Sequence, residues 1–379
     1  MVMRVGTRSR DEQTGEKGRF TKAGRRIKDA VAQWLWFALP VDPERIGYGK
    51  GPLTWLRQRK HKKSRKHIHI CLLDYLAEGG RQSRFTEFWI NERSRLCSAS
   101  INEGIENADV VWIYCKDPIP PKEKDGLLQV LKRARPGTPV VNHPEVYNSY
   151  HEERVFEALA EAGVSVPRSE FSDRDVGKTL VVYKTKGRHG HAPKFMSEYE
   201  GFKDGYRAFE FVGSRGPDGL NRRYRAYYLL GAVYPSLLRS SGNWNVYSQT
   251  AERTETYEMT SNETDQVRLI ANTLGLRYFA VDYLRRIEDD SPVFVDLNVY
   301  PDVISKLGNL GAKFGYHGHW HTLETDAHWL SLAAEAHQAG SAGSAGSATP
   351  GRPFWHVFDE AMQSFLQKEF LQKETDTKR

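Results

Sequence analysis

Three oxygen-bearing side chains lie at the ends of two adjacent predicted strands near position 290: Asp282, Asp296 and Asn298. Side chains alternate along a strand, so Asp296 and Asn298 share one face, and Asp282 is expected opposite them on the neighbouring strand. Such hard oxygen ligands are typical of Mg²⁺, which leaves positions free for phosphates and water. The competing structural interpretation is an edge-strand Asp and a turn Asn before a proline. The motif alone favours that interpretation.

Basic side chains elsewhere have the chemistry to bind phosphate. Lys184 closes an apolar strand and precedes the loop Gly187-Arg188-His189-Gly190. A lysine in that position can reach phosphate oxygens while backbone N–H groups approach them. Arg225 and Arg239 follow in the next polar and aromatic segment, and arginine suits bidentate contact with phosphate or carboxylate. Taken singly, each arginine could equally form a surface salt bridge, and the loop matches no standard phosphate-binding motif.

Two kinds of sheet are needed to position these residues. Short apolar strands at 67–73, 110–115 and 139–142 alternate with helical segments, including 125–133, which predicts a small parallel α/β layer. A helix is predicted over 150–162. Beyond it, glycine-rich turns and few helices indicate an antiparallel α+β region. Its predicted strands are 179–184, 208–212, 223–230, 232–235, 278–284 and 293–297, with a helix at 262–274.

The charge of the 379-residue chain is uneven. Residues 1–70 hold 18 Lys and Arg against 6 Asp and Glu, whereas the whole chain carries a formal charge of +7. Residues 1–66 are therefore expected to form a basic, partly disordered arm, either solvated or bound to an anionic partner. No apolar run approaches the ~20 residues of a membrane span, and no signal cleavage site is present, so a cytoplasmic protein is expected. Three widely spaced cysteines argue against a disulfide framework.

Five short motifs follow one another in a fixed order along the chain. They are Asn142-His143-Pro144 with the segment 159–167, Val181-Val182-Tyr183-Lys184, Phe209-Glu210-Phe211-Val212, the segment from Tyr224-Arg225 to Arg239, and Asp282 with Asp296-Leu297-Asn298. In this order the chain resembles the ATP-grasp superfamily, in particular carboxylate–amine ligases such as glutathione synthetase and the ribosomal-protein glutamate ligase. The resemblance runs from about residue 67 to residue 321.

This resemblance implies an ATP-grasp fold preceded by a small parallel α/β domain, with ATP and Mg²⁺ as cofactors. It implies that Lys184 holds nucleotide phosphate, that Glu210, Phe211 and Val212 meet adenine, and that Asp282, Asp296 and Asn298 hold Mg²⁺. Arg225 and Arg239 would be the catalytic residues. The implied reaction activates a small acid, amino acid or peptide carboxylate as an acyl phosphate, which an amine acceptor then attacks.

The chain departs from the family pattern in two residues of this set. Arg154 stands where many members carry a lysine, and it is expected to take that role as a cation. Asp296 stands where Glu is usual, which shortens the reach by one methylene. The alternatives to a ligase are an ATP-grasp phosphotransferase, a non-catalytic nucleotide-binding protein, and a nucleic-acid binder acting through residues 57–66.

The expected domains are the arm at 1–66, a small α/β domain at 67–145 and the ATP-grasp domain at 146–330. A Gly/Ser/Ala linker at 338–352 then leads to an amphipathic helix at 353–375, which either packs on the body or binds a partner. The stretch His317-Gly318-His319-Trp320-His321 is either a metal-binding segment or a run of surface histidines. The oligomeric state is left open.

Overall fold

A computed structural model describes residues 67–77, 79–185, 193–196, 206–246, 250–301 and 354–376. The predicted basic arm, the loop after Lys184, the His317–His321 stretch and the Gly/Ser/Ala linker lie outside the described residues. In the described part, no helix combines the length and apolar character needed to cross a membrane.

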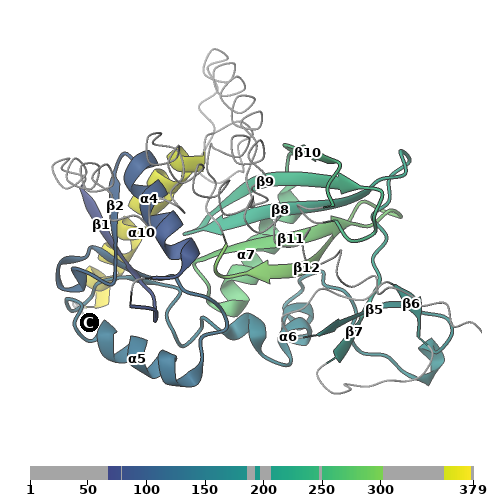
Figure 1. The fold of residues 1–379 in the computed structure, drawn as a ribbon, viewed down its shortest axis with the longest axis horizontal. Helices are drawn as coiled ribbons and strands as arrows, with labels where there is room; N and C mark the ends of the chain where they lie inside the picture. The colour runs from purple at the N-terminus through teal and green to yellow at the C-terminus, as the bar shows by residue number, and fades with distance from the viewer. Residues whose placement is uncertain are drawn as a thin grey trace, which may run out of the picture.

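The first sheet is parallel, with strand order β2-β1-β3-β4 (Figure 1). Its strands are β1 (Ile68–Leu73), β2 (Cys97–Ile101), β3 (Val110–Ile113) and β4 (Val140–Val141), and its connecting helices are α4 (Arg81–Arg93) and α5 (Pro121–Leu131). The sequence predicted β1, β3, β4 and α5 but not α4 or β2. Cys71, Cys97 and Cys115 are buried free thiols.

Two antiparallel sheets follow, so the predicted mixture of a parallel α/β layer and an α+β region is confirmed. The small sheet has order β6-β5-β7, from β5 (Leu180–Thr185), β6 (Lys194–Phe195) and β7 (Tyr206–Glu210). The large sheet has order β10-β9-β8-β11-β12, from β8 (Asn221–Leu229), β9 (Ala232–Ser241), β10 (Arg253–Glu255), β11 (Tyr278–Arg285) and β12 (Pro292–Asn298).

Local signals explain the helices of this second region. Helix α6 (Val155–Glu161) is shorter than the predicted 150–162, because a 3₁₀ turn at Ser149–His151 precedes it. Helix α7 (Ser261–Leu274) begins with a capping box between Thr260 and Glu263 and ends at Gly275, whose φ of 67° suits glycine.

Alternation along the strands divides the interior into two clusters. On β1, Ile70 and Leu72 pack toward α4, whereas Cys71 and Leu73 pack toward α5 and α7. Both clusters also include residues of β8 and β11, so the parallel sheet and the large antiparallel sheet share their core. The proposed domain boundary at residue 145 stays a prediction.

Helix α10 (Phe354–Asp376) lies beside α4 against the parallel sheet (Figure 1). Its buried residues Phe354, Trp355, Phe358, Ala361, Met362, Phe365 and Leu366 belong to the same cluster as Trp112 and Tyr227. At the N-terminal end of the helix, the Phe354 ring packs edge-on against Tyr227 and Tyr234. The C-terminal segment is therefore a helix, as predicted, and it packs on the body.

Candidate active site

Three neighbouring strands bring charged side chains into one row. Asp282 on β11 lies directly opposite Asp296 on β12, as strand alternation predicts, and opposite Arg225 on β8. The pairing of β11 with β12 is irregular immediately after Asp282, and that of β8 with β9 immediately after Arg225. Such irregularities re-aim side chains and occur beside active sites. Tyr227 and Arg225 are two residues apart on β8 and share one face of the sheet. Tyr227 packs in the apolar core, whereas Arg225 is charged.

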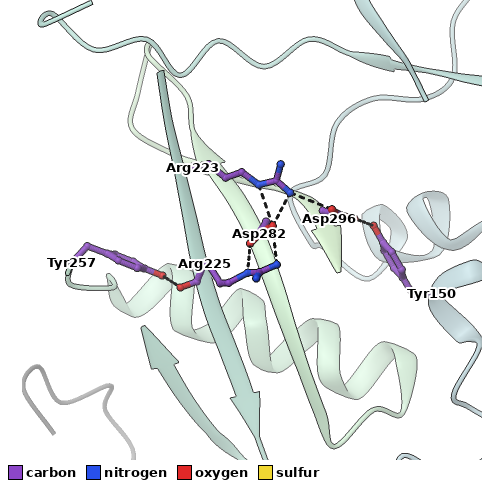
Figure 2. Close-up of polar contacts among 6 residues, drawn as sticks. All are labelled: Tyr150, Arg223, Arg225, Tyr257, Asp282 and Asp296. Carbon is purple, nitrogen blue, oxygen red and sulfur yellow. Dashed lines mark hydrogen bonds and ion pairs between the residues drawn. The ribbon is translucent and has the colours of Figure 1, made fainter. Parts of the chain in front are cut away.

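Asp282 is held by two guanidinium groups (Figure 2). Arg225 Nε donates to Asp282 Oδ1 at 2.7 Å, and Arg225 Nη2 donates to Oδ2 at 3.2 Å. Arg223 donates to Oδ2 through Nη2 at 2.6 Å and through Nε at 3.1 Å. The Asp282 side chain is only 4% exposed. Burial raises its pKa, but the two arginines outweigh this and hold the pKa far below its usual range, so the carboxylate is ionised.

Arg223 also reaches the second carboxylate, because its Nη2 donates to Asp296 Oδ2 at 3.1 Å. Sequence reasoning missed this residue. The available signal was its spacing, since Arg223 and Arg225 are two apart on one strand and therefore share a face.

Asp296 is more open than Asp282, with 46% of its side chain exposed. The Tyr150 hydroxyl donates to Asp296 Oδ1 at 3.4 Å. Burial and the Asp296 carboxylate raise the pKa of Tyr150 well above its usual value, so this hydroxyl stays a donor. Sequence reasoning missed Tyr150, which lies about 150 positions earlier in the chain and gives no local signal of this contact.

Arg239 is buried near Asp282 but not in direct contact with it. It lies opposite Arg223 on the neighbouring strand and is 9% exposed. Within the described residues, its guanidinium has no hydrogen bond or ion pair. Burial and the nearby Arg225 lower the pKa of Arg239 to about 10, which keeps it charged at neutral pH. Three guanidinium groups thus gather around two carboxylates, an excess of positive charge that suits an anion.

The third predicted metal ligand, Asn298, follows on β12. Its Oδ1 accepts a hydrogen bond from the Tyr300 backbone N–H at 2.9 Å. In the part of the chain that is described, no group of three His, Cys, Asp or Glu side chains is placed to hold a metal ion. A metal site here would therefore consist of two carboxylates and an amide oxygen. The role of these three residues as ligands stays a prediction.

The predicted nucleotide-binding residues lie on other elements. Lys184 lies on β5 opposite Arg207 of β7. At the end of β7, the N–H groups of Glu210 and Phe211 donate to the carbonyls of Arg168 and Leu180, which fixes this segment.

The side chains of the remaining predicted residues have contacts outside the charged row. The Glu210 carboxylate pairs with Arg286 at 3.4 Å, and Val212 is buried. Arg154 is 78% exposed and lies 4.0 Å from Glu161. Among the contacts seen in the described residues, none joins these side chains to Asp282 or Asp296, and their roles stay predictions.

Comparison with known proteins gives matches among solved structures alone. No family model matches the chain, and no curated protein gives a significant match. The ATP-grasp ligase PsnB, complexed with precursor peptide PsnA2 and AMPPNP, aligns with 61% of this chain and 88% of its own at 15% identity and a TM-score of 0.42. The D-cycloserine synthetase DcsG aligns with 65% of this chain and 98% of its own at 13% identity and a TM-score of 0.41.

A third similar structure is the macrocyclase MdnC bound with precursor peptide MdnA, from Microcystis aeruginosa MRC. It aligns with 62% of this chain and 93% of its own, at 10% identity and a TM-score of 0.39. Of these three structures, PsnB is named as a member of the superfamily that the sequence motifs of this chain resemble. Because the identities and TM-scores are low, the roles of individual residues rest on the contacts of this chain.

Proposed function

We propose that this chain is an ATP-dependent ligase of the ATP-grasp type, which joins a carboxylate to an amine through an acyl phosphate. The observation that carries the proposal is the buried guanidinium of Arg239, which has no hydrogen bond or ion pair among the described residues. A buried charge costs free energy unless it is paired. An anionic group of the substrate, such as a transferring phosphoryl group, would supply the missing partner.

Arg225 and Arg239 would stabilise the negative charge that develops during the reaction. In the first step, a carboxylate oxygen attacks the terminal phosphorus of ATP and ADP leaves. In the second step, an amine attacks the acyl carbon, phosphate leaves and the amine loses a proton. Arg225 is held for this role, because Asp282 pairs with its guanidinium and the Tyr257 hydroxyl donates to its carbonyl at 2.9 Å.

The donor chemistry of Asp282, Asp296 and Asn298 fits Mg²⁺, which prefers oxygen ligands. The two carboxylates lie close enough to bond to the same nitrogen, Arg223 Nη2. Bound Mg²⁺ would neutralise part of the charge on the nucleotide phosphates.

The remaining assignments of the proposal rest on the sequence motifs. Lys184 would hold nucleotide phosphate, Glu210 to Val212 would lie at the adenine edge, and Arg154 would contribute a further cation. The carboxylate substrate would be a small acid, an amino acid or a peptide.

The test of this proposal is the release of ADP from MgATP with pools of acids, amino acids and peptides, with and without hydroxylamine. Hydroxylamine traps an acyl phosphate as a hydroxamate. We expect hydroxamate from the wild-type protein and a loss of at least about 100-fold in Arg239→Met, because one donor to the developing charge is removed. Arg222→Met is the matched control, since Arg222 lies on the neighbouring strand β8 and pairs with Asp218.

Other outcomes of this assay would replace the ligase with another function. Release of ADP without hydroxamate, together with phosphorylation of an alcohol, would indicate a phosphotransferase. Binding of MgATP without turnover in any pool would indicate a nucleotide-binding protein.

A further inference from the structure

Arg223 occupies the space between the two carboxylates that would hold a metal ion. Its Nη2 lies 2.6 Å from Asp282 Oδ2 and 3.1 Å from Asp296 Oδ2, as Figure 2 shows. The Arg223 side chain is 12% exposed. A divalent cation bound by both carboxylates would need the same oxygens. The guanidinium and the metal ion are therefore competitors for one position.

The two carboxylates depend on Arg223 to different degrees. Asp282 keeps two hydrogen bonds from Arg225 if Arg223 is removed. Asp296 would keep only the longer contact from Tyr150, at 3.4 Å, among the contacts seen in the described chain. Removing Arg223 should thus leave the buried carboxylate paired and the half-exposed one free to bind a cation.

We propose that Arg223 is a positioning residue that couples the binding of metal to the binding of nucleotide, an inference that rests on the proposed function. A metal ion alone must displace Arg223 from both carboxylates and so break both of these ion pairs in a largely buried place, which is costly. An arriving phosphate offers Arg223 a new anion. Metal and nucleotide therefore bind cooperatively, each raising the affinity for the other by the same factor.

Binding of Mn²⁺ tests this inference without any need for the acid substrate. Mn²⁺ is titrated into the full-length protein, followed by electron paramagnetic resonance, with and without AMPPNP. For Arg223→Gln, we expect at least tenfold tighter binding of Mn²⁺ alone and a smaller enhancement by AMPPNP than in the wild type. Arg222→Gln is the matched control, because Arg222 is the adjacent residue and its ion pair, with Asp218, is elsewhere. It should behave as the wild type.

Two further variants test whether the gain in Mn²⁺ affinity depends on Asp296 and on the shape of the Arg223 side chain. Asp296→Asn added to Arg223→Gln should abolish the gain, since it removes the carboxylate that Arg223 releases. Arg223→Lys keeps the charge but cannot bridge the carboxylates as a planar fork, so we expect a smaller gain than with Gln. Circular dichroism spectra like that of the wild type would show that the variants are folded.

The possible failures can be told apart. Equal Mn²⁺ affinity and equal enhancement by AMPPNP in the wild type and Arg223→Gln would overturn the coupling role and leave the ligase proposal standing. Absence of both Mn²⁺ and AMPPNP binding in the wild type would overturn the proposed function, and the inference with it.

Discussion

At the scale of single residues, Arg239 is a cation at a position where its charge lowers the stability of the fold. Arg239 is 9% exposed and has no hydrogen-bond or ion-pair partner within the described residues. Its neighbours Arg223 and Arg225 are also cationic, and both already pair with Asp282. Desolvation and repulsion therefore outweigh the attraction of Asp282, and together they oppose the folded state at this position. This cost in stability is what the proposed role of Arg239 in binding an anion would require.

Replacing Arg239 with Met should separate stability from activity. We expect Arg239→Met to keep or raise the free energy of unfolding, by up to about 2 kcal/mol, because it removes an unpaired buried charge and retains the apolar volume. Urea unfolding at pH 7 measures this. Under the same conditions Arg222→Met, which breaks a partly exposed pair with Asp218, should lose no more than about 1 kcal/mol. A large loss of stability in Arg239→Met would show that Arg239 has a structural partner.

Part of this row could be predicted from the sequence. The alternation of Asp296-Leu297-Asn298 on a short strand next to the Asp282 strand gives the relative placement of these residues, because it depends only on local periodicity. The contacts of Arg223 and Tyr150 with Asp296 could not be predicted in the same way. They depend on which strands are neighbours and on where a distant 3₁₀ turn lies, and neither is encoded locally.

At the scale of elements, α4 shows how tertiary contacts replace a local start signal. Its N-cap residue is Gly80, which has no capping side chain. Instead, the Asp74 carboxylate accepts a hydrogen bond from the Gly80 N–H at 2.8 Å, and the Tyr300 hydroxyl accepts one from the Ser83 N–H at 2.9 Å. Asp74 lies six residues upstream of Gly80, and Tyr300 lies more than 200 residues downstream. A search for Ser, Thr, Asp or Asn at the cap therefore misses this helix.

Because of Glu87 on α4, the free energy of unfolding of the protein should decrease as pH rises. Burial, together with the nearby Glu103 carboxylate, raises the pKa of Glu87 to about 7. Because the folded state holds this proton more tightly than the unfolded state, the free energy of unfolding should decrease as pH rises from about 4.5 to about 7. Glu87→Gln should remove this decrease and be more stable than the wild type by about 2 kcal/mol above pH 7.

Urea unfolding of the wild type and Glu87→Gln at pH 5 and pH 8 measures the difference. Glu145→Gln is the control, since the Glu145 side chain is 69% exposed and its replacement should change the free energy of unfolding by less than about 0.5 kcal/mol. If the gap between wild type and Glu87→Gln is the same at both pH values, the ionisation of Glu87 does not affect stability.

At the scale of the whole molecule, α10 completes the core that the parallel sheet begins. Phe358 is 1% exposed, and its ring stacks over Trp112 with centroids 6.2 Å apart. The next residue, Asp359, accepts hydrogen bonds from the Ser94 hydroxyl and the Arg95 N–H. Aromatic packing and a specific polar contact thus fix the same turn of the helix against the segment that follows α4.

Phe358→Ala should therefore destabilise the entire fold. Removing a buried aromatic ring costs about 3–5 kcal/mol through lost apolar contact and the cavity left behind. Leu371→Ala on the same helix is the control, because Leu371 is 64% exposed, and it should cost less than about 0.5 kcal/mol. Chemical unfolding followed by tryptophan fluorescence measures both. Equal effects of the two substitutions would mean that α10 is not part of the core.

The position of α10 in the chain has a consequence for biosynthesis. The parallel sheet is complete at Val141, whereas the helix that covers one of its faces ends at Asp376. Translation is directional and adds roughly 5–20 residues per second, so α10 is complete only about 10–50 s after the parallel sheet. Throughout that interval, a ribosome-bound chain lacks the aromatic residues of α10, such as Phe358, that pack against Trp112. The growing polypeptide is therefore a natural client for chaperones that bind exposed aromatic surface.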